Sequence, residues 1–541
     1  MSDSADPRPP KPVVQVIVDA LASRVVRPAI DAGKLPNVAA VIERGGVRWD
    51  CTSIFPSITP AATCALTTGQ YPDRTHIAGA YWFDPETNEV AYFGDDIWTI
   101  LAESPGRYIH DFQIGLNFHR LKADTVFEML EEVGHSTAAL NSMWFRGPHP
   151  HALHTPVEFE LAPGVSMATE LLGPTVMTLA DFCRSGGVEG GEPLEAPGGP
   201  TRRYGFHDEA TSQFLLDLYG RNRPPAYTLA YFPNNDFESH EHGPQNALPV
   251  LEQLDKTLGG LFALYGGVDS FLEKFAFLMT GDHSQADCDD DPNAREIDLT
   301  EVLSDFSVVH GGEDWERGEQ LLVCPNMRAA QIYLSEDGPS LEQVRDAVLT
   351  CERIDQAIWR TPIHRTGGPN PGNEPTMFYV ATANRGTLRF SPASGPEAVE
   401  LPGGATAVDR YGNLWRYEGD LKALDGRIES GGGADGVDLI TFPDYPNAFE
   451  RITTSFFPES GALWATAFPG SEFRLPRTTT HFGGSHGSLH QLDSASPLIF
   501  GGLPDDVAMP DHPRTVDVVP LAMRCLNATP PWEPGEGRVV E

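Results

Sequence analysis

The sequence predicts an α/β fold, with a mainly parallel central sheet flanked by helices and an inserted α+β cap subdomain. Signals for strands and helices alternate over the first half of the chain. The first of them, VVQVIV (13–18), is a continuous apolar, β-branched run, as expected for a strand buried on both faces. The stretch from about 285 to 480 breaks this alternation with short runs around Gly and Asn turns, which is typical of antiparallel strands.

The elements follow one another with recognisable ends. LPNVAAVIER (35–44) has helical periodicity and stops at Gly45, and ADTVFEMLEEVG (123–134) repeats that pattern and stops at Gly134. Alternation of strand and helix favours a parallel sheet with helices on its faces. Further core strands are predicted at TAALN (137–141), YTLAYF (227–232), FAFLMT (275–280) and PLIF (497–500).

The same patterns divide the chain into segments. A Gly/Pro-rich stretch at 184–203 is expected to be an exposed loop, and LEQVRDAVLTCERIDQAI (341–358) predicts one or two helices within the cap. The predicted division is a frayed tail at 1–11, the first part of the α/β core at 12–284, the inserted α+β cap subdomain at 285–480, and the second part of the core at 481–541.

The composition excludes several classes of protein. Of 541 residues, 38 are Lys or Arg and 76 are Asp or Glu, which gives a formal net charge of −38. Such a chain is unsuited to nucleic-acid polymers, whose phosphates are held by Lys and Arg, and to anionic membrane surfaces. An anionic substrate would therefore need a local positive centre, such as a bound metal ion.

Neither a membrane span nor a signal peptide is expected. No run of 18 apolar residues occurs, and the N-terminus, MSDSADPRPPKP, lacks an apolar core. The seven cysteines are an odd number without a CxxC pair, which argues against a disulfide framework and against a Cys-type zinc finger. Together these features predict a reducing compartment and hence a cytoplasmic protein, with export by a route that needs no signal peptide as the alternative.

Acidic and imidazole side chains follow the predicted core strands. In an open α/β sheet, ligands gather at the carboxyl ends of the strands, so side chains placed there converge. A single Asp at a strand end is most often a turn or capping residue, so the hypothesis depends on the joint pattern. Asp and His together suit zinc or manganese. The candidate ligands are Asp19, Asp236, His240, Asp282, His283 and His486.

The segment FPSITPAATCALTTG (55–69) adds a candidate nucleophile. Pro60 suits the first position of a helix, which predicts Thr59 as the N-cap residue with its hydroxyl at the positive end of the helix dipole. An ordinary capping threonine would have the same pattern. A free hydroxyl is a poor nucleophile at neutral pH, but a metal ion bound to its oxygen would activate it. The helix N-terminus would also stabilise an anionic phosphoryl group.

These motifs together resemble the alkaline phosphatase superfamily, in its nucleotide pyrophosphatase/type I phosphodiesterase branch. The matching segments are the strand-ending Asp19, FPSIT ending in Thr59, TTGQYPDRTHIAG, NNDFESHEHGP, GDHS and GSHGS, and they occur in the family's order. The resemblance covers the core from 19 to 486, while 285–480 carries none of these motifs. It implies an alkaline-phosphatase-like fold and an enzyme that hydrolyses phosphoric ester or anhydride bonds.

The resemblance also implies two divalent metal ions, with zinc as the expected metal and manganese as the alternative. Two ions roughly 4 Å apart clamp the attacking and leaving oxygens of an in-line displacement. Three carboxylates and three neutral imidazoles nearly balance two such ions, and the remaining positive charge attracts phosphate. The resemblance assigns Asp236, His240 and His486 to one ion, and Asp19, Asp282, His283 and the bridging nucleophile Thr59 to the other.

One position near the nucleophile departs from the family. Many members have an Asn three residues after it that contacts a phosphate oxygen, and here that residue is Ala62. Lys122 and Arg146 are the candidates to replace it, since Arg binds phosphate through two nitrogens and Lys as a point charge, although both also serve as surface or capping residues. The sulfatase pattern C/S-x-P-x-R is absent, because Pro60 stands one residue early and Thr63 replaces the Arg.

The leading hypothesis is a two-metal phosphohydrolase that cleaves a phosphodiester or pyrophosphate bond in a small phosphorylated substrate, through a covalent phospho-threonine intermediate. A phosphomonoesterase, a phosphonate hydrolase or a phosphoryl transferase would use the same metal site. The resemblance alone favours a diester or pyrophosphate over a monoester. A monoester carries one more negative charge, so monoesterase sites usually add cationic donors. A sugar-phosphate mutase and a non-catalytic, metal-stabilised binding protein are further alternatives, but a binding protein has no need of the nucleophile Thr59.

Overall fold

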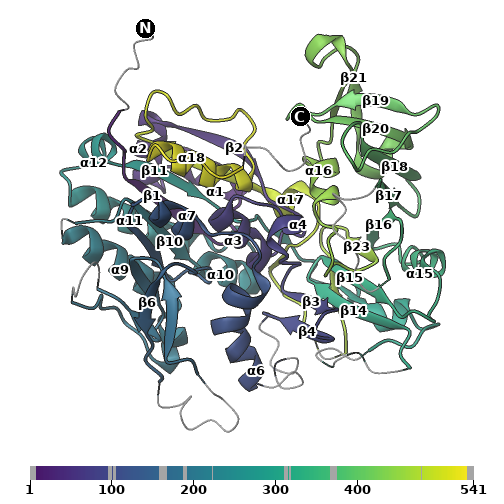
Figure 1. The fold of residues 1–541 in the computed structure, drawn as a ribbon, viewed down its shortest axis with the longest axis horizontal. Helices are drawn as coiled ribbons and strands as arrows, with labels where there is room; N and C mark the ends of the chain where they lie inside the picture. Colours follow the sequence, from purple (N-terminus) through teal and green to yellow (C-terminus); the bar gives the residue numbers. More distant parts are fainter. Residues whose placement is uncertain are drawn as a thin grey trace.

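The central sheet has eight strands in the order β2-β26-β11-β1-β10-β5-β8-β9 (Figure 1). The computed structural model describes residues 8–94, 100, 105–156, 167–186, 192–221, 223–309, 313, 315, 318–365, 375–476 and 478–532. The run β11-β1-β10-β5-β8 is parallel, whereas β26 is antiparallel to both of its neighbours and β9 to β8. The predicted mainly parallel α/β core is therefore confirmed. The strands are β1 (Val13–Val18), β2 (Gly46–Thr52), β5 (Thr137–Leu140), β8 (Val176–Leu179), β9 (Cys183–Arg184), β10 (Tyr227–Phe232), β11 (Ala276–Thr280) and β26 (Ala495–Gly501).

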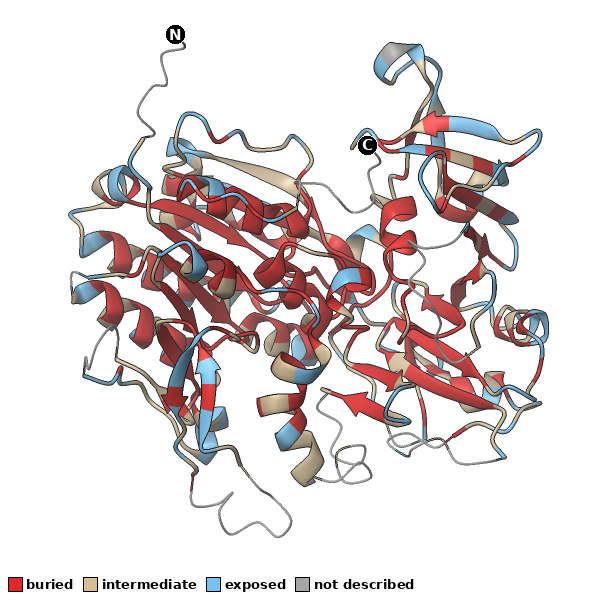
Figure 2. Cartoon of the chain, viewed as in Figure 1, coloured by how far each residue is buried: buried red, intermediate tan, exposed pale blue. Residues whose placement is uncertain are grey.

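Helices cover both faces of this sheet, which explains the unbroken apolar run of β1. Successive side chains of a strand point to opposite faces. Val14, Val16 and Val18 pack into a core with helices α1, α2, α9, α11 and α12, whereas Val13 and Ile17 pack on the other side with α3, α7 and α18. Figure 2 shows the resulting buried strands between the two helical layers. These helices are α1 (Ser23–Asp31), α2 (Pro36–Arg44), α3 (Thr59–Thr68), α7 (Val126–Glu132), α9 (Asp208–Gly220), α11 (Leu248–Ala263), α12 (Val268–Lys274) and α18 (Val518–Cys525).

A second sheet of ten strands lies beside the core (Figure 1, green) and comes from the region predicted as the cap. All but one of its neighbouring pairs are antiparallel. The expected α+β subdomain is thus present; its exact bounds stay a prediction. In spatial order the strands are β14 (Leu321–Asn326), β15 (Ala329–Leu334), β23 (Leu463–Ala467), β16 (Ile354–Thr361), β17 (Met377–Ala381), β18 (Thr387–Pro392), β20 (Leu414–Gly419), β19 (Ala405–Val408), β22 (Leu439–Thr441) and β21 (Arg427–Glu429).

One prediction within this subdomain was wrong in its second half. Helix α15 (Leu341–Val348) begins with a capping box, in which Ser340 and Gln343 bond each other's backbone N–H groups. The residues from Ile354 onward form strand β16 instead of a helix. β16 is hydrogen-bonded to β23 on one side and to β17 on the other, so pairing within the sheet overrides a weak helical propensity.

Shorter elements complete the molecule. Four two-stranded sheets pair β3 (Tyr81–Asp84) with β4 (Glu89–Tyr92), β6 (His149–Ala152) with β7 (Glu170–Gly173), β12 (Ala286–Asp287) with β25 (Gly484–Ser485), and β13 (Glu296–Asp298) with β24 (Glu472–Arg474). The remaining helices include α4 (Pro72–Thr75), α6 (Pro105–His110), α10 (Asn234–His242), α13 (Pro292–Arg295), α14 (Leu299–Val302), α16 (Ala448–Thr453), α17 (Gln491–Ser494), the π-helix η1 (Asp111–Arg120) and the 3-10 helices η2 (Pro200–Gly205), η4 (Leu421–Leu424), η5 (Ala434–Gly436) and η6 (Thr515–Asp517).

Two predicted irregular segments are only partly described. Of the tail expected at 1–11, residues 1–7 lie outside the described residues, and Arg8 Nη1 and Lys11 N both donate to the carbonyl of Cys525, at 2.8 and 2.9 Å. Of the loop expected at 184–203, residues 187–191 lie outside the description, and η2 begins at Pro200. Among the described residues, no helix is long and apolar enough to cross a membrane.

Candidate active site

The candidate ligands meet at the edge of the sheet where the parallel strands end. β1 and β11 are each followed by an aspartate, and helix α10 begins just after β10 and carries an Asp and a His one turn apart. A loop after β25 supplies the last His. The ligand atoms within each of two groups lie within 4.8 Å of one another. Group one is Asp236, His240 and His486, and group two is Asp19, Asp282 and His283.

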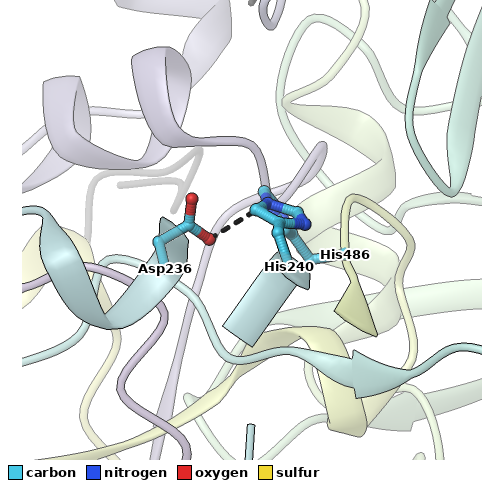
Figure 3. A group of neighbouring side chains, drawn as sticks. All are labelled: Asp236, His240 and His486. Carbon is cyan, nitrogen blue, oxygen red and sulfur yellow. Dashed lines mark hydrogen bonds and ion pairs between the residues drawn. The ribbon is translucent and has the colours of Figure 1, made fainter. Parts of the chain in front are cut away.

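In group one, the three side chains converge on a common point (Figure 3). Asp236 Oδ1 lies 3.2 Å from His240 Nε2 and 3.6 Å from His486 Nε2. The two Nε2 atoms are 3.3 Å apart. All three residues are buried, so the shielding by water between these polar atoms is weak.

Backbone carbonyls fix the tautomer of both imidazoles in group one. His240 Nδ1 donates to the carbonyl of Gly484 at 2.8 Å, and His486 Nδ1 donates to the carbonyl of Ser57 at 2.7 Å. A carbonyl oxygen can only accept, so Nδ1 carries the proton and Nε2 presents its lone pair. Two lone pairs and a carboxylate that face one another form the donor set of a divalent metal site.

The backbone also fixes the imidazole of group two. Asp19 Oδ1 and Asp282 Oδ2 lie 3.3 and 3.4 Å from His283 Nε2. His283 Nδ1 donates to the carbonyl of Ser284 at 3.0 Å, so its Nε2 also presents a lone pair. Neither Asp19 Oδ1 nor Asp282 Oδ2 has a hydrogen-bond partner, although both atoms are buried. Buried carboxylate oxygens without a donor fit a cation.

The electrostatics of the two groups fit metal binding. Burial raises the pKa of Asp19 well above its ordinary value, and the neighbouring charge of Asp282 raises it further. Burial, followed by the proximity of His283, lowers the pKa of His486 well below its ordinary value, so this imidazole is neutral, the form that binds a metal. Crowded buried carboxylates repel one another, and a divalent cation between them would offset that repulsion. The residues present therefore fit one ion in each group.

Thr59 lies beside group two, but not as the predicted N-cap. Helix α3 begins at Thr59 itself, and the cap is Ile58, whose carbonyl accepts from Ala62 N at 2.8 Å. Ile58 is extended and offers no side-chain cap, which leaves Thr59 as the first helical residue. The Thr59 hydroxyl lies 3.0 Å from His283 Nε2. The hydroxyl is therefore both at the N-terminus of a helix and within reach of the group two ligand atoms.

Three supporting residues were missed by the sequence analysis. The Tyr231 hydroxyl donates to Asp19 Oδ2, and Asn235 Nδ2 donates to the backbone carbonyl of Asp19 at 2.7 Å. Gln285 Nε2 donates to Asp236 Oδ1 at 3.4 Å. In the sheet, Tyr231 pairs with Ile17, two residues before Asp19. In the sequence, Asn235 and Gln285 each lie within two residues of a candidate ligand. These three residues could have been predicted from their closeness to the candidate ligands, in the sequence or across the paired strands.

The residue after His486 has to be glycine for steric reasons. Gly487 has a φ of 117°, a conformation that L side chains rarely adopt. A Cβ at this position would lie 2.5 Å from the carbonyl oxygen of Asn326. The GSHGS motif therefore needs glycine here to let the backbone that carries His486 approach the second sheet.

A cavity with a volume of about 460 Å³ opens onto both groups. Its walls include Thr59 together with ligand residues of each group. Arg203 is the one Lys or Arg on these walls within the part of the chain that the structure describes. Gln113 also lines the cavity, and its amide nitrogen is buried without a hydrogen-bond partner. The cavity is therefore connected to the candidate nucleophile and carries little positive charge of its own.

The two predicted phosphate-binding residues do not line this cavity. Arg146 donates to Glu128 at 2.9 Å and to the backbone carbonyl of Asn117 at 3.0 Å. Lys122 is exposed, and its Nζ donates to the backbone carbonyl of His119 at 3.1 Å. Arg146 thus joins helix α7 to the π-helix η1, and Lys122 lines a separate, polar cavity. The structure brings together the seven predicted metal and nucleophile residues but not these two.

Solved structures with the same fold bind small anions. The chain is similar to phosphonoacetate hydrolase from Sinorhizobium meliloti 1021 in complex with phosphonoformate, at 15% sequence identity and a TM-score of 0.51, over 96% of each chain. It is also similar to murine ectonucleotide pyrophosphatase/phosphodiesterase 5, at 14% identity and a TM-score of 0.52, over 96% of each chain. An inactive form of that murine protein was solved in complex with AMP. At these identities the similarity shows the fold alone.

The sequence match to a protein family is more specific than these similarities in fold. The model of the type I phosphodiesterase/nucleotide pyrophosphatase family matches residues 13–361, which is more than half of the chain. The matched residues include every candidate ligand of groups one and two except His486. The protein therefore belongs to the type I phosphodiesterase/nucleotide pyrophosphatase family, a family of hydrolases that act on phosphoric ester or anhydride bonds.

Proposed function

We propose that this protein hydrolyses a phosphodiester or pyrophosphate bond with two divalent metal ions, through a covalent phospho-threonine intermediate on Thr59. The observation that carries the proposal is the 3.0 Å distance between the Thr59 hydroxyl and His283 Nε2. It puts a nucleophilic side chain next to a buried group with the donor set of a metal site. A protein that only bound metal would have no use for a hydroxyl at this position.

Each group of ligands would hold one ion, with zinc as the metal that Asp and His favour and manganese as the alternative. When bound, the ions would supply Lewis acidity and positive charge at the phosphoryl group. The three protonated Nδ1 atoms keep the imidazoles oriented toward the ions. Tyr231 and Asn235 hold Asp19 in place from behind.

The reaction would proceed in two displacements. Thr59 Oγ1 forms a bond to phosphorus while the bond from phosphorus to the leaving ester oxygen breaks, and the hydroxyl proton passes to the leaving group. Water then attacks phosphorus, the bond to Thr59 Oγ1 breaks, and Thr59 regains a proton from that water. The positive end of the α3 dipole, at Thr59, would stabilise the charge of the anion in both steps.

Gln113 would supply the amide donor that Ala62 cannot. A backbone N–H can only donate, so the 3.0 Å bond from Ala168 N identifies the Gln113 side-chain oxygen and leaves its NH₂ group on the other side. That NH₂ group is buried in the wall of the cavity that contains Thr59 and has no partner. We propose that it donates to a non-bridging oxygen of the substrate phosphoryl group.

A diester or pyrophosphate is favoured over a monoester by the charge of the site. The described cavity wall offers one cationic side chain, Arg203, whereas a monoester brings one more negative charge to be stabilised. A phosphonate hydrolase is the second candidate, because a solved structure with this fold is phosphonoacetate hydrolase in complex with phosphonoformate.

A hydrolysis panel on zinc- and manganese-loaded protein tests the proposal. The panel contains a bis-aryl phosphodiester, an aryl phosphate monoester, an aryl phosphonate and an aryl sulfate. We expect the diester to have the highest kcat/KM. Fast hydrolysis of the phosphonate alone would favour the second candidate, and no hydrolysis of any member would contradict both.

A further inference from the structure

The cavity beside Thr59 is lined mainly by carbon. Aromatic and thioether side chains from several elements converge on it, and η1 contributes the ring of Phe112. Its volume of about 460 Å³ is that of a pocket for a small organic group. Apolar side chains on its walls include Ile58, Phe93, Phe112, Met143, Phe206 and Met327.

Several polar groups on the walls are already engaged within the protein. The Tyr108 hydroxyl donates to the carbonyl of Gly94 at 3.2 Å, and the Tyr231 hydroxyl donates to Asp19. His481 Nδ1 bonds Glu472 Oε1 at 2.9 Å. These groups have little hydrogen-bonding capacity left for a ligand, so the described wall presents a mainly apolar surface away from Gln113, Arg203 and the metal ligands.

We propose that this cavity receives a bulky apolar ester arm of the substrate, such as an aryl or long alkyl group. The inference rests on the proposed function, because it is Thr59, on the wall of the cavity, that would attack the phosphorus. Transfer of an apolar arm from water into the cavity is favourable, and the free energy gained is proportional to the apolar area that is buried. A nucleoside arm would instead bury polar edges of its base and sugar against the mainly apolar wall. Polar groups that lose water without gaining a partner cost binding free energy, so the cavity would select against this arm.

Three diesters with a common p-nitrophenolate leaving group test the substrate class. Their second arms are methyl, phenyl and thymidine 5′-yl, so the chemistry of the broken bond stays constant. We expect kcat/KM for the phenyl diester to exceed the values for the other two by about tenfold or more. A nucleoside diester that is hydrolysed as well as the phenyl diester would overturn the inference.

A pair of variants locates the effect in the cavity. In Phe112→Ala, we expect the phenyl-to-methyl ratio of kcat/KM to fall by about fivefold or more, because part of the apolar wall is lost. Phe306→Ala is the matched control, since Phe306 is also partly buried but packs in the second sheet's core. An unchanged ratio in Phe112→Ala, or an equal fall in Phe306→Ala, would count against the cavity as the arm's site.

Binding separates this inference from the proposed chemistry. Diphenyl phosphate and dimethyl phosphate are titrated into metal-loaded Thr59→Ala protein by calorimetry. Binding of diphenyl phosphate about tenfold tighter supports the apolar arm site even if no diester is turned over by the native protein, in which case only the proposed function fails. Equal affinities would overturn the inference whatever the hydrolysis panel gives.

Discussion

His240 Nε2 lies 3.3 Å from His486 Nε2, although 246 residues separate the two in the sequence. Each Nδ1 donates to a backbone carbonyl and therefore carries the proton of its ring. The two Nε2 atoms have lone pairs, which face each other in a buried space. This arrangement is unfavourable in itself and becomes favourable when a cation is bound between the nitrogens. The predictions below follow from it and from the position of Thr59.

The first prediction concerns the number of metal ions. Native mass spectrometry should find two divalent ions per chain, and His240→Ala should retain one, because group two keeps all of its ligands. His242→Ala is the matched control, since His242 is on the same helix, α10, but is exposed. Two ions in His240→Ala, or the loss of one in His242→Ala, would contradict the assignment of group one.

The second prediction concerns Tyr231. Its hydroxyl orients Asp19, so Tyr231→Phe should weaken binding of one metal ion about 10- to 100-fold, as expected when a partner of a ligand is removed. The substitution removes a single oxygen and leaves the ring packed. Metal affinity is measured by competition with a chelator. An unchanged affinity would show that Asp19 needs no such support.

A third prediction distinguishes two roles of Gln113. If its NH₂ group binds the phosphoryl oxygen, then Gln113→Glu should lower kcat/KM by about a hundredfold or more, because a carboxylate has no such donor and repels the anion. If Gln113 only accepts the bond from Ala168 N, then the same variant should lose about tenfold or less, from the repulsion between the carboxylate and the anion alone, since glutamate still accepts that bond. Steady-state kinetics on the diester measures this, with metal content as the control.

Much of the site could be predicted from the sequence because it depends on the ends of strands. The run VVQVIV has to be a buried strand, and the residue that follows it, Asp19, must then lie at the edge of the sheet. The same reasoning applies to Asp282 and His283 after β11. His486 lies far along the chain, and its prediction depended on the family's motif as well as on the strand that follows it.

Contacts that depend on how distant elements pack could not be predicted. Gln113 comes from a π-helix whose sequence has no motif, and it reaches the cavity only through the packing of η1 against the core. Arg146 was a reasonable phosphate ligand by residue type, but its position shows that Glu128 and nearby carbonyls use its donors. Strand β16 was mistaken for a helix because its partner β23 lies more than a hundred residues later.

The fourth prediction concerns the nucleophile. Thr59→Ala should keep both ions, because the six other ligands remain, and should lower kcat for the diester by about a thousandfold or more. Thr59→Ser should retain part of the activity, since the hydroxyl survives and a methyl group is lost. Near-normal turnover in Thr59→Ala, with both ions present, would leave water as the nucleophile.

Mass spectrometry of the native protein, quenched with acid during turnover of a phosphodiester, tests the covalent mechanism most directly. The peptide that contains Thr59 should gain the mass of the phosphoryl group with its retained ester arm, and fragmentation should locate the addition on Thr59. The same peptide should be unmodified without substrate. Turnover of the diester without any addition to this peptide, under conditions where the second step is slowed by low pH or low temperature, would contradict the phospho-threonine mechanism.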